Sequence, residues 1–457
     1  MDQLTPGRSL YRMTHPSLPV ERGVEIGEQV SNSAVKHEKR REPLGFAFFG
    51  LFLFMVVYFA RPEDWIPGLA AIPLAKITGI LIFLALTFSF CSIRWRMSLE
   101  VIFLGLLLVQ LWLTVPFSSV WRGGAFNVML DFSKVLPLVI VIYGAVRSLK
   151  RLRWILFVQS ASVSAITIIS IVKAHTPGGR LQGVLFGMYG NSNDLALIID
   201  ISLPLCLAMA LTSRSYWMKL TWTAAMLAMI YAVFLTASRG GAIALLVAAL
   251  LCIWQLGLKS RRFYLLLLVP FAMIVIWLYG GNSLRERFDQ TNLSPATNNQ
   301  STEASKSAQQ REELLFQSLK VTAQHPLLGI GPGNFAIESG VWLVTHNSYT
   351  QISAEGGIPA FLLYMLIFWR GFVNLKDIRK CSKERKGIRL FSMALEASLA
   401  AYLVGSFFAS DAYQLFPYCL VAYTSSLLVI AQRDGTISNG ASKSHLLPAQ
   451  IEVTDWQ

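Results

Sequence analysis

Long apolar stretches alternate with short polar connections along most of the chain, and this pattern predicts the fold. A helix needs about 20 apolar residues to cross a hydrocarbon core of roughly 30 Å. Twelve stretches approach that length and are the expected membrane spans: 44–60, 69–91, 99–117, 126–146, 154–172, 193–212, 219–237, 239–257, 262–280, 348–369, 390–408 and 415–431. The alternating ten-residue segments of a membrane β-barrel are absent. The sequence therefore predicts an all-α, polytopic membrane bundle of about 12 transmembrane helices.

Composition supports this fold class. The 457 residues are 54% hydrophobic and 14% charged, which is unlike an ordinary soluble domain. The five cysteines and six histidines lack the spacing of a disulfide framework or a zinc site, so we expect no metal and no cofactor.

Basic residues indicate the orientation. If the N-terminal tail is cytoplasmic, 28 of the 40 Lys and Arg residues fall on the cytoplasmic side and 10 on the opposite side. The net charge of +14 then reflects topology and anionic lipid, not nucleic acid. The resulting order is a cytoplasmic N-terminal tail, nine spans, a large periplasmic loop, three spans and a cytoplasmic C-terminal tail, with these limits: 1–43, 44–280, 281–347, 348–431 and 432–457.

The outer segment 281–347 changes character at Arg311. Residues 289–310 are rich in Asn, Gln, Ser and Thr, so we expect them to be poorly ordered. From Arg311 to Ala323 the leucines recur at helical spacing, which predicts an amphipathic helix on the membrane surface.

Three short signatures fall on the outer face of this topology: Ser238-Arg239-Gly240-Gly241, then Arg311 followed by His325-Pro326-Leu327-Leu328-Gly329-Ile330-Gly331, and finally His346-Asn347-Ser348-Tyr349. Ser238 is a suitable helix N-cap, and a helix N-terminus with an arginine attracts phosphate. The paired glycines would let a bulky head group approach the backbone. Alternatively, Arg239 only extends to the membrane interface, and Arg311 is an ordinary surface arginine.

His346 lies at the outer mouth of the tenth span. Histidine can accept a proton near neutral pH, so His346 is a candidate general base, although an interfacial polar role is the alternative. Within the spans, five ionisable residues need an explanation: Lys76, Asp131, Lys134, Asp200 and Glu396. Pairing in the bundle interior would explain them, and so would a transporter or flippase of lipid-linked glycans or solutes.

Together the motifs resemble the bacterial O-antigen ligase and O-antigen polymerase family. The resemblance rests on Gly190-Asn191-Ser192-Asn193-Asp194-Leu195-Ala196, on the three outer signatures, and on Glu355-Gly356-Gly357. It covers about residues 185 to 370. Ligase members tend to continue the histidine motif with a glycine and two threonines, whereas this chain has Ala360, Phe361 and Leu362. That departure favours a polymerase over a ligase.

The resemblance implies an inverting, metal-independent glycosyltransferase at the outer face of the bacterial inner membrane. Its donor would be a glycan on undecaprenyl pyrophosphate, and its acceptor a hydroxyl of another glycan or lipid-linked molecule. Arg239 and Arg311 would hold the pyrophosphate and His346 would activate the acceptor. Supporting roles would fall to Ser238, Gly240, Gly241, Asn191, Asn193, Asn347, Tyr349 and Glu355.

Overall fold

The computed structural model describes residues 45–66, 68–69, 72–90, 98–176, 179–185, 187–258, 299–381 and 385–433. Within these ranges the regular structure is helical and contains no strand. The helices are α2 (Gly45–Ala60), α3 (Pro62–Trp65), α4 (Leu74–Phe90), α5 (Leu99–Thr114), α6 (Arg122–Phe132), α7 (Val135–Ala145), α8 (Leu149–Val172), η3 (Gly187–Tyr189), α9 (Ser192–Thr212), α10 (Tyr216–Leu235), α11 (Arg239–Cys252), η4 (Ile253–Leu258), α14 (Asn299–Gln324), α15 (Phe335–Glu338), α16 (Ser348–Cys381), α17 (Lys386–Gly405) and α18 (Phe416–Arg433).

The all-α membrane fold is confirmed. Seven helices or joined helix pairs are long and apolar enough to cross a membrane, and α2 and α5 are shorter apolar helices. Every predicted span coincides with helical structure except 262–280, which lies outside the described residues together with the N-terminal tail and the C-terminal tail beyond Arg433. The total of 12 spans and the periplasmic position of the long loop therefore stay predictions.

Helix α9 forms the centre of the second half of the bundle. It packs against α8, α10, α11 and α17, and nearly all of its residues are buried. Apolar residues line all sides of this helix, which is what a helix surrounded by other helices requires. Because α9 packs against α11, the first turn of α9 lies close to the first turn of α11.

The predicted span 126–146 is interrupted. Helix α6 ends at Phe132 and α7 begins at Val135, and the Ser133 hydroxyl bonds back to the carbonyl of Met129. Asp131 and Lys134 form the expected ion pair, but their side chains are 78% and 65% exposed. An interior location for this pair was therefore wrong, because the turn at the interruption directs both side chains outward.

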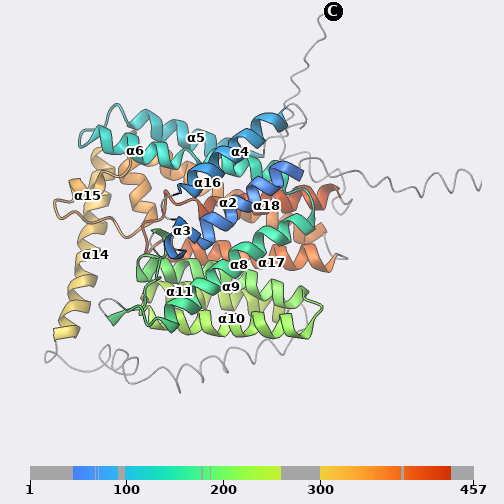
Figure 1. Ribbon diagram of the computed structural model, residues 1–457. Helices are drawn as coiled ribbons and strands as arrows, with labels where there is room; N and C mark the ends of the chain where they lie inside the picture. The colour runs from blue at the N-terminus through green and yellow to red at the C-terminus, as the bar shows by residue number, and fades with distance from the viewer. Residues whose placement is uncertain are drawn as a thin grey trace, which may run out of the picture. The chain divides into compact units, whose positions relative to one another are not determined.

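Helix α14 runs across the direction of α9 and α10 in Figure 1, as expected of a helix on a membrane surface. It begins at Asn299, so the expectation of a poorly ordered strip up to Gln310 was wrong for residues 299–310. Alanine, glutamine and glutamate in this stretch are adequate helix formers even without an apolar stripe. Leu314, Ser318 and Val321 form its buried face, which packs against α16.

Helix α16 is broken at Gly357, whose backbone is non-helical at φ 79° and ψ 175°. The turn after α14 satisfies the freed backbone groups. Ile330 and Gly331 donate N–H groups to the carbonyls of Ala354 and Glu355 at 3.0 and 2.9 Å, and Ile358 donates to Pro326 at 2.7 Å. A Cβ at position 357 would lie 2.5 Å from the Leu327 carbonyl oxygen, so only glycine fits.

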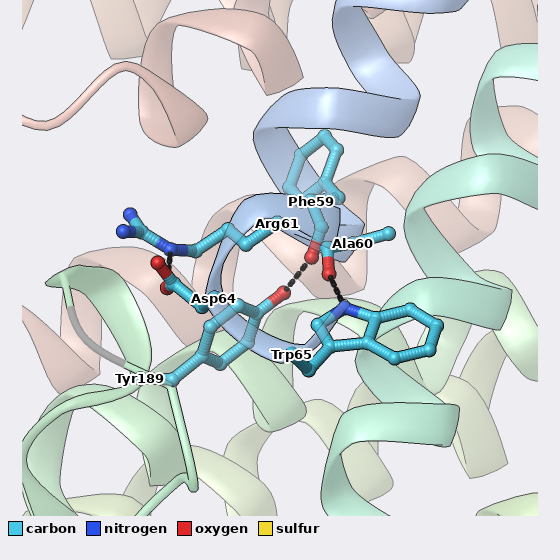
Figure 2. A network of polar contacts seen from close by, with 6 residues as sticks. All are labelled: Phe59, Ala60, Arg61, Asp64, Trp65 and Tyr189. Carbon is cyan, nitrogen blue, oxygen red and sulfur yellow. Dashed lines mark hydrogen bonds and ion pairs between the residues drawn. The ribbon is translucent and has the colours of Figure 1, made fainter. Parts of the chain in front are cut away.

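The connection after α2 also uses side chains to complete a helix end. Figure 2 shows the Tyr189 hydroxyl donating to the carbonyl of Phe59 at 2.7 Å and the Trp65 indole donating to Ala60 at 2.9 Å. Arg61 has a left-handed φ of 44° and pairs with Asp64 at 2.5 Å. These contacts join the end of α2 to the 3₁₀ turn that precedes α9.

Basic residues assigned to one side of the membrane do lie together. Burial and the nearby charge of Arg433 lower the pKa of Arg147, so the connection before α8 lies beside the end of α18. Arg153 at the start of α8 donates to Thr212 at the end of α9, at 3.5 Å. These contacts fit helices that alternate in direction, as the distribution of lysine and arginine predicted.

Candidate active site

Arg239 is the first residue of α11. Ala237 has a left-handed φ of 48°, which turns the chain sharply after α10. Ser238 then caps the helix, because its hydroxyl accepts the N–H of Gly241 at 3.1 Å. The exposed Arg239 side chain thus begins at the positive end of a helix, where an anion is favoured.

The two glycines after Arg239 allow close packing of helices. A Cβ at Gly240 would lie 2.4 Å from the Cβ of Phe408, and one at Gly241 would lie 2.6 Å from the Cβ of Ala196. The space beside them is therefore filled by Phe408 and Ala196, and the expected approach of a head group to this backbone was wrong. Their contribution is to let α11 lie against α9 and against the segment after α17.

Arg311 lies on α14, next to the buried face of that helix. Leu314 and Ser318 follow it at helical spacing and are buried, while Arg311 itself is half-buried. Burial lowers the pKa of Arg311, and the charge of Arg239 lowers it further. The second effect requires the two guanidinium groups to be near each other, although 72 positions separate them in the sequence.

His346 is held in a strained backbone conformation between two anchored neighbours. Its φ is 53°, an uncommon value for a residue with a side chain. The hydroxyl of Thr345 donates to the Asn347 carbonyl at 2.8 Å and lies 3.1 Å from the Ser410 hydroxyl. The Asn347 side chain accepts the N–H groups of Tyr349 and Thr350, which starts α16. These contacts fix the direction in which the imidazole leaves the chain.

The three predicted residues come together electrostatically. Burial lowers the pKa of His346 below its usual 6.5, and the charge of Arg311 lowers it further. Arg311 therefore lies close to both Arg239 and His346. Among the described residues, no hydrogen bond or ion pair engages any of these three side chains, so their donors and the imidazole remain available to a ligand. Two arginines beside a neutral imidazole form an arrangement that can bind an anion and accept a proton.

Arg180 is a nearby residue that the sequence did not single out. Its guanidinium donates to the Asn193 side chain at 3.0 Å and to the Thr236 carbonyl at 2.9 Å. Asn191 caps α9 by accepting the N–H of Asn193 at 2.7 Å. Arg180 thus connects the start of α9 to the turn that leads to Arg239. The only sequence signal was its place among the outer arginines.

The remaining predicted residues hold the surrounding helices in place. The Tyr349 hydroxyl donates to the Leu403 carbonyl at 2.5 Å, which ties α16 to α17. One carboxylate oxygen of Glu355 accepts the Phe335 N–H at 3.2 Å, and its buried second oxygen has no hydrogen-bond partner among the described residues. Direct roles of these two residues in the chemistry stay predictions.

Asp411 and Asp194 form an acidic pair that the sequence did not reveal. The Asp411 N–H donates to the Ser348 hydroxyl at 2.9 Å, two residues from His346. Burial raises the pKa of Asp411 well above its usual range, and the charge of Asp194 raises it further. A buried carboxyl group therefore lies beneath the start of α16.

The intramembrane ionisable residues have separate surroundings. Glu396 pairs with Arg379 and accepts a hydrogen bond from Gln255 at 2.8 Å. Asp200 is fully buried, with no partner for either oxygen among the described residues, whereas Lys76 is exposed. Within the described ranges, no three His, Cys, Asp or Glu side chains are grouped so that they could hold a metal ion.

Comparison with known proteins identifies the segment that carries this arrangement. A family model described as O-antigen ligase matches residues 224–365, which include Arg239, Arg311 and His346. This segment is therefore similar to the O-antigen ligase family. The motif at Gly190–Ala196 lies outside the match, and no curated protein matches the chain. The match confirms the resemblance to the O-antigen ligase and polymerase family seen in the motifs, and it indicates an enzyme that transfers glycosyl groups.

Proposed function

We propose that the protein is a membrane glycosyltransferase that moves a glycan from undecaprenyl pyrophosphate to an acceptor hydroxyl. The observation that carries this proposal is the proximity of Arg311 to both Arg239 and His346. Two guanidinium groups repel each other unless an anion lies between them, and a pyrophosphate supplies the required negative charge. The lipid bilayer, the lipid-linked donor and a glycan or lipid-linked acceptor are the expected partners.

In this mechanism the acceptor hydroxyl attacks the anomeric carbon of the donor sugar. His346 takes the hydroxyl proton as the new glycosidic bond forms, and the bond between the anomeric carbon and the pyrophosphate oxygen breaks. The leaving pyrophosphate gains negative charge, which Arg239 and Arg311 stabilise from fixed positions. Attack opposite the leaving group inverts the anomeric centre. The residues named here supply both binding and proton transfer, so the step needs no metal.

The acceptor class that we favour is a growing glycan, which makes the enzyme a polymerase of surface polysaccharide. Ala360, Phe361 and Leu362 occupy the positions where ligases tend to have a glycine and two threonines. Phe361 packs against the apolar core, and Leu362 is 53% exposed on α16. These apolar side chains are typical of a membrane-spanning helix. The site would face the periplasm from the bacterial inner membrane, with both chain termini in the cytoplasm.

The decisive experiment is deletion of the gene followed by gel analysis of lipid-linked glycans and surface polysaccharide. A polymerase predicts that single repeat units accumulate on the lipid carrier. Full-length chains on the carrier would instead identify a ligase to the lipid A core. Unchanged lipid-linked glycans and polysaccharide would contradict glycan transfer altogether and would favour a transporter of another solute.

A further inference from the structure

The turn that follows α14 is built into the break of α16. The turn donates two backbone hydrogen bonds to Ala354 and Glu355 and accepts one from Ile358. In addition, the Gln110 amide of α5 donates to the Leu327 carbonyl at 2.7 Å and to the Gly356 carbonyl at 3.1 Å. Thus several backbone groups of this turn are hydrogen-bonded to α5 and α16. The Leu327 side chain, in contrast, is 70% exposed.

Leu327 emerges between two exposed apolar stripes. On α16 the stripe begins one residue after the break, and it consists of Ile358, Leu362, Leu366 and Trp369. On α5 the stripe flanks Gln110, and it consists of Leu106, Val109 and Leu113. Large apolar side chains at helical spacing on the outside of membrane-spanning helices face lipid. The surface on which Leu327 lies is therefore continuous with the lipid-facing surface.

The position of the turn along α16 places it deeper than α14. Thr322 of α14 lies 3.0 Å from the Ser353 hydroxyl, so α14 packs at the level of Ser353. Gly357 is four residues further along the helix, or about 6 Å deeper at 1.5 Å per residue. A surface helix at the level of Ser353 thus puts Leu327 below the membrane interface.

We propose that residues 325–331 form a re-entrant turn that inserts Leu327 among the acyl chains of the bilayer. Irregular backbone at membrane depth is tolerated only where its polar groups have partners. Here Gln110 and the broken part of α16 provide those partners, and leucine is the side chain that hydrocarbon accepts. The turn anchors the end of α14 and thereby the helix that carries Arg311.

This inference concerns the membrane and not the reaction, so it can be tested apart from the proposed function. The photoreactive residue p-benzoylphenylalanine is introduced separately at Leu327, Leu362 and Glu312. Leu362 is the lipid-facing reference, and Glu312 is an exposed position on α14. Full-length protein in phosphatidylethanolamine and phosphatidylglycerol vesicles is irradiated, and peptides carrying an acyl-chain adduct are quantified by mass spectrometry.

We expect the adduct yield at Leu327 to be within about threefold of the yield at Leu362, with little at Glu312. A yield at Leu327 as low as that at Glu312 would overturn the proposal. A second measurement avoids the bulky residue: Leu327→Cys and Glu312→Cys are treated with a membrane-impermeant maleimide and followed by the mass of their own peptides. Slower labelling of Leu327→Cys, by tenfold or more, supports insertion, and equal rates contradict it.

Discussion

Two pairs of arginines at opposite ends of the bundle have different surroundings. At the end where α5 and α17 begin, Arg370 donates to Asn374 and Asn374 donates to Glu100, while Arg379 pairs with Glu396. At the end where α11 and α16 begin, Arg311 lies close to both Arg239 and His346. Arg370 and Arg379 thus have described hydrogen-bond or carboxylate partners, whereas no described carboxylate pairs with Arg239 or Arg311.

The difference separates structural charges from functional ones. A partly buried cation that pairs with a carboxylate links two helices, and its charge is not available to a ligand. Repulsion between two neighbouring cations raises the free energy of the unliganded protein. Binding of an anion between them removes this repulsion. Arg61 lies beside Gly187 and pairs with Asp64, so the absence of a described partner holds for Arg239 and Arg311 and not for Arg61.

The largest expected effect comes from removing the proposed base. His346→Ala should lower glycan transfer by at least about 10²-fold, because no substitute proton acceptor is provided. Folding should be retained, since the side chain makes no hydrogen bond to another described residue. The measurement is glycan formation in a deletion strain at matched membrane levels. His175→Ala is the control, because His175 is an exposed histidine outside the matched segment 224–365. Near-normal product from His346→Ala would remove the general-base role.

Changes to the arginine pair should have the next largest effect. Arg311→Gln removes a charged hydrogen-bond donor worth about 2–3 kcal/mol, or roughly 30- to 150-fold in transfer. Arg239→Lys keeps the charge but loses the planar fork that grips phosphate, so partial activity should remain. The assay is again glycan formation at matched membrane levels, and Lys320→Gln on the exposed face of α14 is the control. Equal activity in Arg311→Gln and Lys320→Gln would show that the pair does not bind the donor.

At the opposite end, a substitution should affect stability without affecting the reaction. Glu396→Ala leaves Arg379 without its carboxylate partner, and breaking a buried pair costs about 3–5 kcal/mol. The two side chains are 17% and 21% exposed, so a value near the lower limit is expected. Thermal unfolding in detergent should report the loss, while transfer per folded molecule stays unchanged. A loss of activity without a loss of stability would give Glu396 a functional role and break the comparison between the ends.

The sequence predicted the helices well because hydrophobic length determines them. Most predicted span limits differ from the helix limits by only a few residues, and Ser238 is the N-cap that separates α10 from α11. The break at Gly357 was not predicted, because it depends on Pro326 and Leu327, which are far away in the sequence. The outward position of Asp131 and Lys134 likewise depends on a turn that apolar periodicity does not reveal.

The three site residues were predicted because each combines an unusual side chain with a position on one side of the membrane. Topology alone placed Arg239, Arg311 and His346 on the same face, and the structure brings them together. Arg180 was missed because its importance lies in its contacts with Asn193 and Thr236. Gly240 was misinterpreted because a glycine that permits helix packing has the same sequence signal as one that admits a ligand.

The smallest effect is a shift in pH dependence, and it tests whether the arginines and the histidine act together. The mechanism requires neutral His346, whose pKa lies below 6.5 because of burial and the charge of Arg311. The rate of transfer should therefore be maximal at neutral pH and should decline only as the pH falls through that lowered pKa. Arg311→Gln removes one of the two causes, so the midpoint of its residual activity should move to higher pH, while burial keeps it below the ordinary value. The midpoint for Lys320→Gln should not move. The profile is measured as kcat/KM with purified enzyme in vesicles, because kcat/KM reports the ionisation of the free enzyme. A midpoint that stays fixed or falls in Arg311→Gln would mean that the group titrating in the assay is not a histidine beside this arginine.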